Sequence, residues 1–126
     1  CCFAIRKADY LAMGGFDERF QSRGGGLANL DIFQRALIRN DLEYVVLLGE
    51  GSFHQVHGGV ATSSPMEHHP WTEFNQEFTR LRGHPFVRVP RKPVLLGDIP
   101  KEAELAAEFS KRVGAALWQK YPAVTL

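Results

Sequence analysis

The sequence has 126 residues, of which 44% are hydrophobic and 23% charged. This length and balance are typical of one ordinary globular domain. Fifteen Lys and Arg against fourteen Asp and Glu give a net charge of +1, which argues against a chain-wide nucleic-acid surface, and no apolar run approaches the ~20 residues of a membrane span.

Apolar residues at spacings of three and four predict helices that begin or end near Gly, Pro or a capping residue. The predicted helices are residues 7–13, 30–40, 71–82 and 101–121. Asn29 or Asp31 would cap the second helix, and Gly83 would end the third. The last helix is expected to pack on the body of the protein or on a partner.

The β-branched run from Tyr44 to Leu48 predicts a strand, and residues 3–5 and 52–57 predict shorter ones. The stretch from Phe86 to Leu96 is extended, and its prolines restrict it to a sheet edge or an arm. Strands and helices mix without a regular βαβ repeat, so the predicted fold class is α/β or α+β.

Two cysteines stand side by side at positions 1 and 2 and make no disulfide framework. Reduced thiols are typical of proteins in reducing compartments, and the first residues have no basic flank of the kind that opens a secretory leader. We therefore expect a cytoplasmic protein, at most peripheral to a membrane. Because the sequence does not begin with Met, we also expect it to be part of a longer chain.

Three carboxylates are candidates for acid–base chemistry. Asp17 and Glu18 lie in a predicted bend, and Asp31 follows a loop over residues 22–26 that contains three successive glycines. General bases are often mounted at such loop–helix junctions. Aspartate is also favoured there for turns and caps, so both interpretations stay open.

The histidines raise the question of a metal site. His54 and His57 are three residues apart in a predicted strand, so they would point to opposite faces unless the chain turns at Val56. One of them could ligate a metal. A small metalloprotein that also uses the His68–His69 pair and the N-terminal cysteines is an alternative, although these spacings fit no standard zinc pattern. The ordinary interpretation of His68–His69 is a solvated loop.

Five basic residues surround Phe86 and could receive a diphosphate or an anionic glycan, because the guanidinium group matches phosphate oxygens. They could equally form a solvated face. These residues are Arg80, Arg82, Arg88, Arg91 and Lys92. No glycine motif of the dinucleotide-binding or P-loop type is present.

Three segments, taken in order, resemble the family 2 inverting glycosyltransferases. They are GGFDE at 14–18, DIFQRA at 31–36 and FHQVHGG at 53–59. In that family, GGFDE precedes a Gly-Gly-Glu-Asp-x-Asp-Leu segment that ends near Arg-Ala, and a late strand carries a His toward the metal. The resemblance covers most of residues 3–88 and implies a partial GT-A fold, with a mixed sheet flanked by helices.

The resemblance implies transfer of a sugar from a nucleotide-sugar donor to an acceptor hydroxyl, with inversion and with a divalent cation, Mn or Mg. Residues 1–126 would be a single domain that supplies the acceptor side, with a helical extension over 100–126. The donor half and its Asp-x-Asp motif would precede Cys1, so we predict that the isolated chain is inactive. The implied roles are catalysis by Asp31, Asp17 or Glu18; substrate binding by Gly25, Gly26, Asn29 and Arg35; and metal binding by His57 or His54.

One departure from the family pattern concerns the base. The family's Glu-Asp pair falls on Ala28 and Asn29 here, and neither is a base. The base therefore lies elsewhere, with Asp31 nearest, or the alignment shifts locally, or the domain is inactive. The alternative function is a non-catalytic glycan-binding or assembly module. A half-domain would also leave sheet edges and apolar surface open, which predicts a homodimer, with the helix over 101–121 as a candidate contact.

Overall fold

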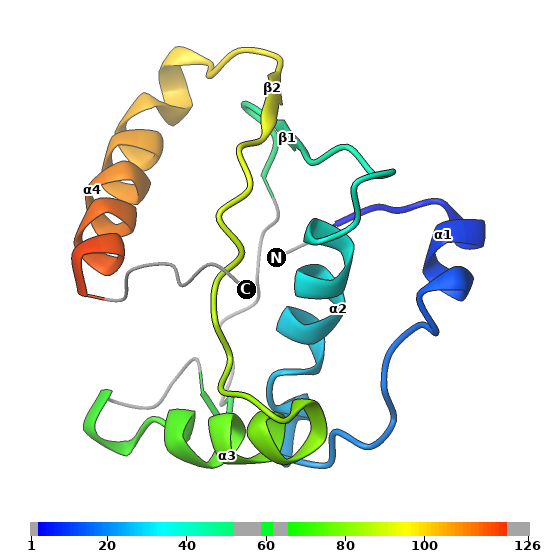
Figure 1. Cartoon of the computed structure of the whole chain (residues 1–126). Coiled ribbons are helices and arrows are strands. Elements are labelled where there is room, and N and C mark those ends of the chain that lie inside the picture. The colour runs from blue at the N-terminus through cyan, green and yellow to red at the C-terminus, as the bar shows by residue number, and fades with distance from the viewer. Residues whose placement is uncertain (1–2, 52–58, 62–65, 121–126) are drawn as a thin grey trace. The chain divides into compact units, whose positions relative to one another are not determined.

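The computed structural model describes residues 3–51, 59–61 and 66–120 (Figure 1). It mixes helices and strands, which confirms the predicted class at that level. The main elements are α1 (Lys7–Ala12), α2 (Ala28–Leu37), β1 (Val45–Leu47), α3 (Trp71–Arg82), β2 (Val94–Leu96) and α4 (Glu104–Lys120), with 3-10 turns at Arg23–Gly25, Met66–His68 and Lys101–Ala103.

The chain forms two compact units, each built from two segments of the sequence. Unit 1 comprises Cys1–Ala36 and Phe53–Phe86, and unit 2 comprises Leu37–Ser52 and Val87–Leu126. Because the positions of the two units relative to one another are not determined, each unit is described by itself.

The core of unit 1 joins the bend after α1 to helix α3. Phe20 and Leu27 are buried against Phe74 and Phe78, which lie four residues apart on α3. The predicted helix over 71–82 is confirmed at both ends. It stops because Gly83 takes a left-handed conformation (φ 79°) and its N–H donates to the carbonyl of Thr79.

Helix α2 begins and ends earlier than predicted, at Ala28 and Leu37 instead of 30 and 40. The prediction that Asn29 or Asp31 caps it is wrong, because both lie inside the helix, where the N–H of Asp31 already donates to the carbonyl of Leu27 at 2.8 Å. At the other end, within unit 2, the Arg91 guanidinium donates to the carbonyls of Leu37, Arg39 and Leu42. The bond to Leu37 satisfies a carbonyl that the end of α2 leaves open, and the other two hold the chain that follows the helix.

The sheet of unit 2 is a parallel pair, β1 and β2, with Val45 opposite Val94 and Leu47 opposite Leu96 (Figure 1). Strand β1 was predicted, and β2 lies in the proline-rich stretch that was predicted as a sheet edge or an arm. The backbones come close just after the strands: a Cβ on Gly97 would lie 2.9 Å from the Leu48 carbonyl oxygen, and Gly97 has a φ of +89°. Only glycine fits such a position without strain.

The predicted strand over residues 3–5 is wrong, because these residues have no sheet partner among the described residues. Instead, the ring of Phe3 packs against Phe33 of α2, with centroids 6.3 Å apart. The predicted strand over 52–57 lies outside the described residues. In the part of the chain that is described, no helix is both long and apolar enough to cross a bilayer.

Candidate functional site

The GGFDE bend owes its shape to two successive glycines. Gly14 and Gly15 both adopt positive φ angles, 80° and 64°, which side chains other than glycine rarely tolerate. A Cβ on Gly15 would also lie 3.0 Å from the ring and hydroxyl of Tyr10. The Tyr10 hydroxyl accepts the N–H of Phe16 at 3.2 Å, and the two rings meet edge to face. The bend therefore fixes the positions of two aromatic side chains.

Asp31, the carboxylate predicted nearest to the missing base, is buried and paired with arginines. Its side chain is 1% exposed. Arg82 Nε donates to Oδ1 at 2.6 Å and Nη2 to Oδ2 at 2.9 Å, while Arg35 Nε donates to Oδ2 at 2.9 Å. Since both oxygens are occupied and screened from solvent, in this conformation Asp31 is placed to hold structure rather than to accept a proton from a bound hydroxyl.

Asp17 belongs to the same charge cluster. Arg19 donates to it through Nε and Nη2 at 2.9 and 2.7 Å, and Arg82 Nη1 lies 2.9 Å from its Oδ2. The hydrogen bonds from Arg19, helped by Arg82, hold the pKa of Asp17 well below its usual range. The paired carboxylates, Asp31 first, raise the pKa of Arg82. Arg82 thus joins the bend to α2, and its guanidinium lies 5.4 Å from the ring centre of Phe20.

Arg35, predicted to contact substrate, is used inside unit 1. Besides pairing with Asp31, it donates to the carbonyls of Met13 and Gly15 at 2.5 and 2.6 Å. Asp31 and Arg35 are the two charged residues of the DIFQRA segment, and their ion pair holds the GGFDE bend onto α2.

The glycine loop is held from α3. The buried carboxylate of Glu77 accepts the N–H groups of Gln21 and Ser22 at 2.8 and 3.0 Å. A Cβ on Gly26 would lie 3.0 Å from that carboxylate, so Gly26 serves internal packing, whereas a Cβ on Gly25 would meet nothing within 4 Å. Of the two glycines predicted to bind substrate, only Gly25 leaves open space beside its backbone.

A shallow hollow of about 600 Å³ connects the bend to the first turn of α2. Three aromatic rings form its apolar wall, and Lys7 and Asn29 supply polar groups. Its lining is Phe3, Ala4, Ile5, Lys7, Tyr10, Phe16 and Asn29. Asn29, a predicted substrate contact, therefore lines the same hollow as Phe16 of the GGFDE bend. No carboxylate lines this hollow among the described residues.

Glu18 differs from the other two candidate bases. It is exposed, and within the described part of the chain its carboxylate has no hydrogen bond or ion pair. Its backbone carbonyl accepts Gln21 Nε2. Glu18 is thus the candidate base whose carboxylate is open to solvent, although it does not line the hollow.

The predicted metal ligands His54 and His57 lie outside the described residues. Within the ranges that are described, no group of three or more His, Cys, Asp or Glu could hold a metal ion. Of the pair predicted as a solvated loop, His68 is exposed beside Glu67, but His69 is partly buried with its ring against Phe74.

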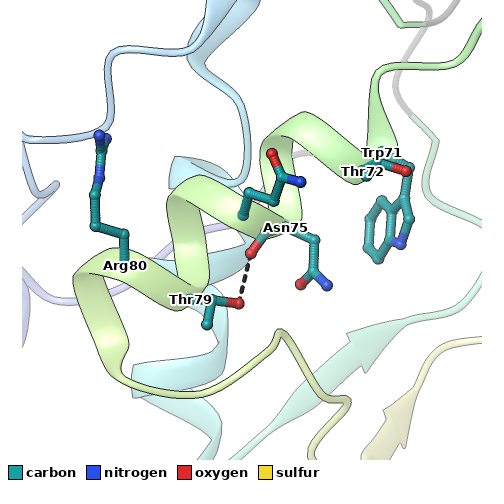
Figure 2. Close-up of a pocket in the computed structure, with 6 residues that line it drawn as sticks. Trp71, Thr72, Asn75, Thr79 and Arg80 are labelled. Carbon is teal, nitrogen blue, oxygen red and sulfur yellow. Dashed lines mark hydrogen bonds between the residues drawn. The ribbon is translucent and has the colours of Figure 1, made fainter.

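A second hollow of about 450 Å³ lies along α3. Figure 2 shows Trp71, Asn75 and Thr79 on successive turns, with Arg80 toward the end of the helix. Two of its polar groups already have partners: Thr79 Oγ1 donates to the Asn75 carbonyl, and Asn75 Oδ1 accepts the N–H of Phe86. All the residues that line this hollow belong to the single helix α3.

The sequence did not predict that Arg82 pairs with Asp31 or that Glu77 holds the glycine loop. Both are charged residues on α3, and the only sequence signal was that Glu77 follows Phe74 and precedes Phe78 on an otherwise apolar face. Arg82 was predicted as part of a basic stretch for a diphosphate, but it and Arg91 are engaged by groups of their own units.

Comparisons of the chain with family models, curated proteins and solved structures found no match.

Proposed function

We propose that this chain is the acceptor-side part of a family 2-like glycosyltransferase, and that it recognises a carbohydrate in the hollow beside Phe16. The single observation that carries this proposal is the joint lining of that hollow by the bend aromatics and by Asn29 at the start of α2. The GT-A character of the complete fold rests on the sequence resemblance alone.

The chemistry of the hollow suits a sugar. The C–H faces of a pyranose ring carry a weak positive charge and stack on the negative faces of aromatic rings. Phe3 and Phe16 are both well exposed for such stacking. An amide such as that of Asn29 can donate to one hydroxyl and accept from another. Aromatic walls with a few placed polar groups are typical of small-ligand sites.

The described residues supply recognition more readily than catalysis. Asp17 and Asp31 are held by arginines, which leaves Glu18 as the candidate base in this part of the chain. His57 or His54 is the proposed metal ligand. The pairing of Asp17 and Asp31 with arginines also favours a second candidate function, a glycan-binding module without transferase activity.

Binding is tested by titrating the chain with monosaccharides and short oligosaccharides, followed by NMR chemical shifts. We expect shifts centred on Phe16 and Asn29. Phe16→Ala and Asn29→Ala should weaken binding at least fivefold, while Trp71→Ala, in the α3 hollow, should leave it unchanged. Absence of saccharide binding, or binding that is insensitive to Phe16→Ala, would overturn the proposal.

Catalysis is tested separately, with a nucleotide-sugar and the saccharide that binds. We expect no transfer by the 126-residue chain. If a longer protein that contains it transfers sugar and Glu18→Gln reduces the rate, the transferase proposal stands. Binding without transfer by that longer protein would favour the glycan-binding module instead.

A further inference from the structure

Helix α4 carries a stripe of large apolar side chains on its exposed side. Leu105, Phe109 and Val113 are spaced by four residues and are 80%, 67% and 42% exposed. At 100° per residue they share one side of the helix. The less exposed positions of the same helix and the turn before it, Ala103, Ala107 and Gly114, fall on the opposite side. The large apolar residues thus lie on the side of the helix opposite its less exposed positions.

An apolar stripe that faces water is a candidate contact surface for a binding partner. In proteins, most of the stability of a helix comes from packing of its apolar face. Exposed apolar patches of this kind mark interaction surfaces. The nature of the occupant can be argued from the charges that flank the stripe.

Glu108 and Arg112 border the stripe on the same side and lie 3.6 Å apart, from Glu108 Oε1 to Arg112 Nε. If two copies of α4 pair antiparallel about a twofold axis near Ser110, Glu108 of each copy lies beside Arg112 of the other. The same axis places Phe109 near its counterpart and Leu105 within about 3 Å, along the helix axis, of the partner's Val113. The flank and the stripe are thus both self-complementary in this one orientation.

We propose that the α4 stripe docks a second copy of this chain, with the two α4 helices antiparallel. The stripe spans only about 12 Å along the helix, and a stable interface usually buries about 800 Å² per partner. The dimer is therefore weak and depends on protein concentration. This inference does not depend on the proposed function.

The test is analytical ultracentrifugation of the whole chain over a range of concentrations. Glu108→Arg and Arg112→Glu each place like charges across the twofold axis, so each should raise the dimer dissociation constant at least about tenfold at low salt. An equimolar mixture of the two variants should regain dimers, because each positive flank then meets a negative one. The double variant E108R/R112E should dimerise like the wild type.

Lys111→Glu is the matched control. It makes the same charge change as Arg112→Glu one residue earlier. Lys111 lies on the side of α4 away from the stripe, although its Nζ is 3.9 Å from Glu108 Oε2, so this change should affect the dimer much less than Arg112→Glu does. Circular dichroism of each variant verifies that the helix is retained. A wild-type monomer at all concentrations would overturn the proposal, as would a mixture that fails to regain dimers. The proposal would also be overturned if Phe109→Ser lowered the unfolding free energy of the monomer. Such a loss would show that another part of the same chain covers the stripe.

Discussion

The two units of this chain differ in whether they bury large apolar side chains, because the fully buried hydrophobic residues among those described all lie in unit 1. In unit 1, the buried hydrophobic residues come together from both of its segments, and charged groups at their margin are paired. In unit 2, the strands and α4 leave their large apolar residues exposed, among them Leu47, Leu95 and Phe109. Unit 1 carries its own core, whereas unit 2 depends more on what covers it. Three pairs of matched variants and one pH series test this difference and the contacts that hold unit 1 together.

The largest effect is expected from one truncation made in each unit. Phe78→Ala empties a fully buried site in unit 1 and should cost about 3–5 kcal/mol of unfolding free energy. Phe109→Ala, measured at a concentration too low for dimers, should cost less than about 0.5 kcal/mol. Urea denaturation measures both. Equal losses would show that unit 2 has a core of its own.

The second comparison concerns two arginines on α3. Arg82→Ala leaves Asp31 buried with a single remaining arginine and should cost about 3 kcal/mol. Arg80 is 70% exposed and lies 3.7 Å from Glu77, so Arg80→Ala should cost less than about 1 kcal/mol. Urea denaturation at neutral pH distinguishes them. A negligible effect of Arg82→Ala would mean that Arg82 does not join the bend to α2.

The third comparison separates backbone strain from steric conflict in the bend. Gly14→Ala and Gly15→Ala both force alanine into positive φ, at about 1 kcal/mol or more each. Gly15→Ala also drives a methyl group into Tyr10, while the space beside Gly14 is open. We therefore expect Gly15→Ala to lower the thermal midpoint further, and to weaken saccharide binding in the Phe16 hollow. Equal midpoints would contradict the contact with Tyr10.

The smallest effect is a pH dependence in unit 1. Because the folded-state pKa of Asp17 lies below its unfolded value, its ion pairs stabilise the fold above about pH 4, the ordinary pKa of aspartate. This contribution is lost as pH falls below that value. Asp17→Asn should therefore destabilise the protein at pH 7, with a gap to wild type that narrows toward pH 2. Denaturation curves between pH 2 and pH 7 measure the difference in unfolding free energy between the wild type and Asp17→Asn. A difference that does not change with pH would exclude a role for the Asp17 charge.

Local pattern predicted the helices better than it predicted the site. The spacing of Phe74 and Phe78, with Gly83 after them, was enough to define α3. Strand β1 also followed from a β-branched run, whereas β2 lies in a stretch predicted as a sheet edge or an arm. Residues 3–5 had a similar composition, but Phe3 packs on Phe33 instead of pairing in a sheet, and no local signal distinguishes these outcomes.

The roles of the charged residues depended on contacts between distant positions. Asp31 was a candidate base because of its place after a glycine loop, but Arg82, 51 residues away, occupies its carboxylate. Glu77 holds a loop 55 residues earlier in the sequence. Asn29 and Phe16 line one hollow, whereas Asp31 does not line it. Their use in binding a sugar stays a prediction.

The division of unit 1 into two segments has a consequence during synthesis. Phe20 and Leu27 leave the ribosome long before Phe74 and Phe78, their apolar partners. The stretch Leu37–Ser52, which belongs to the other unit, is made in between. Until α3 has been synthesised, these early side chains are therefore exposed to chaperones or to neighbouring chains. The interval before α3 emerges is the period of greatest vulnerability to aggregation.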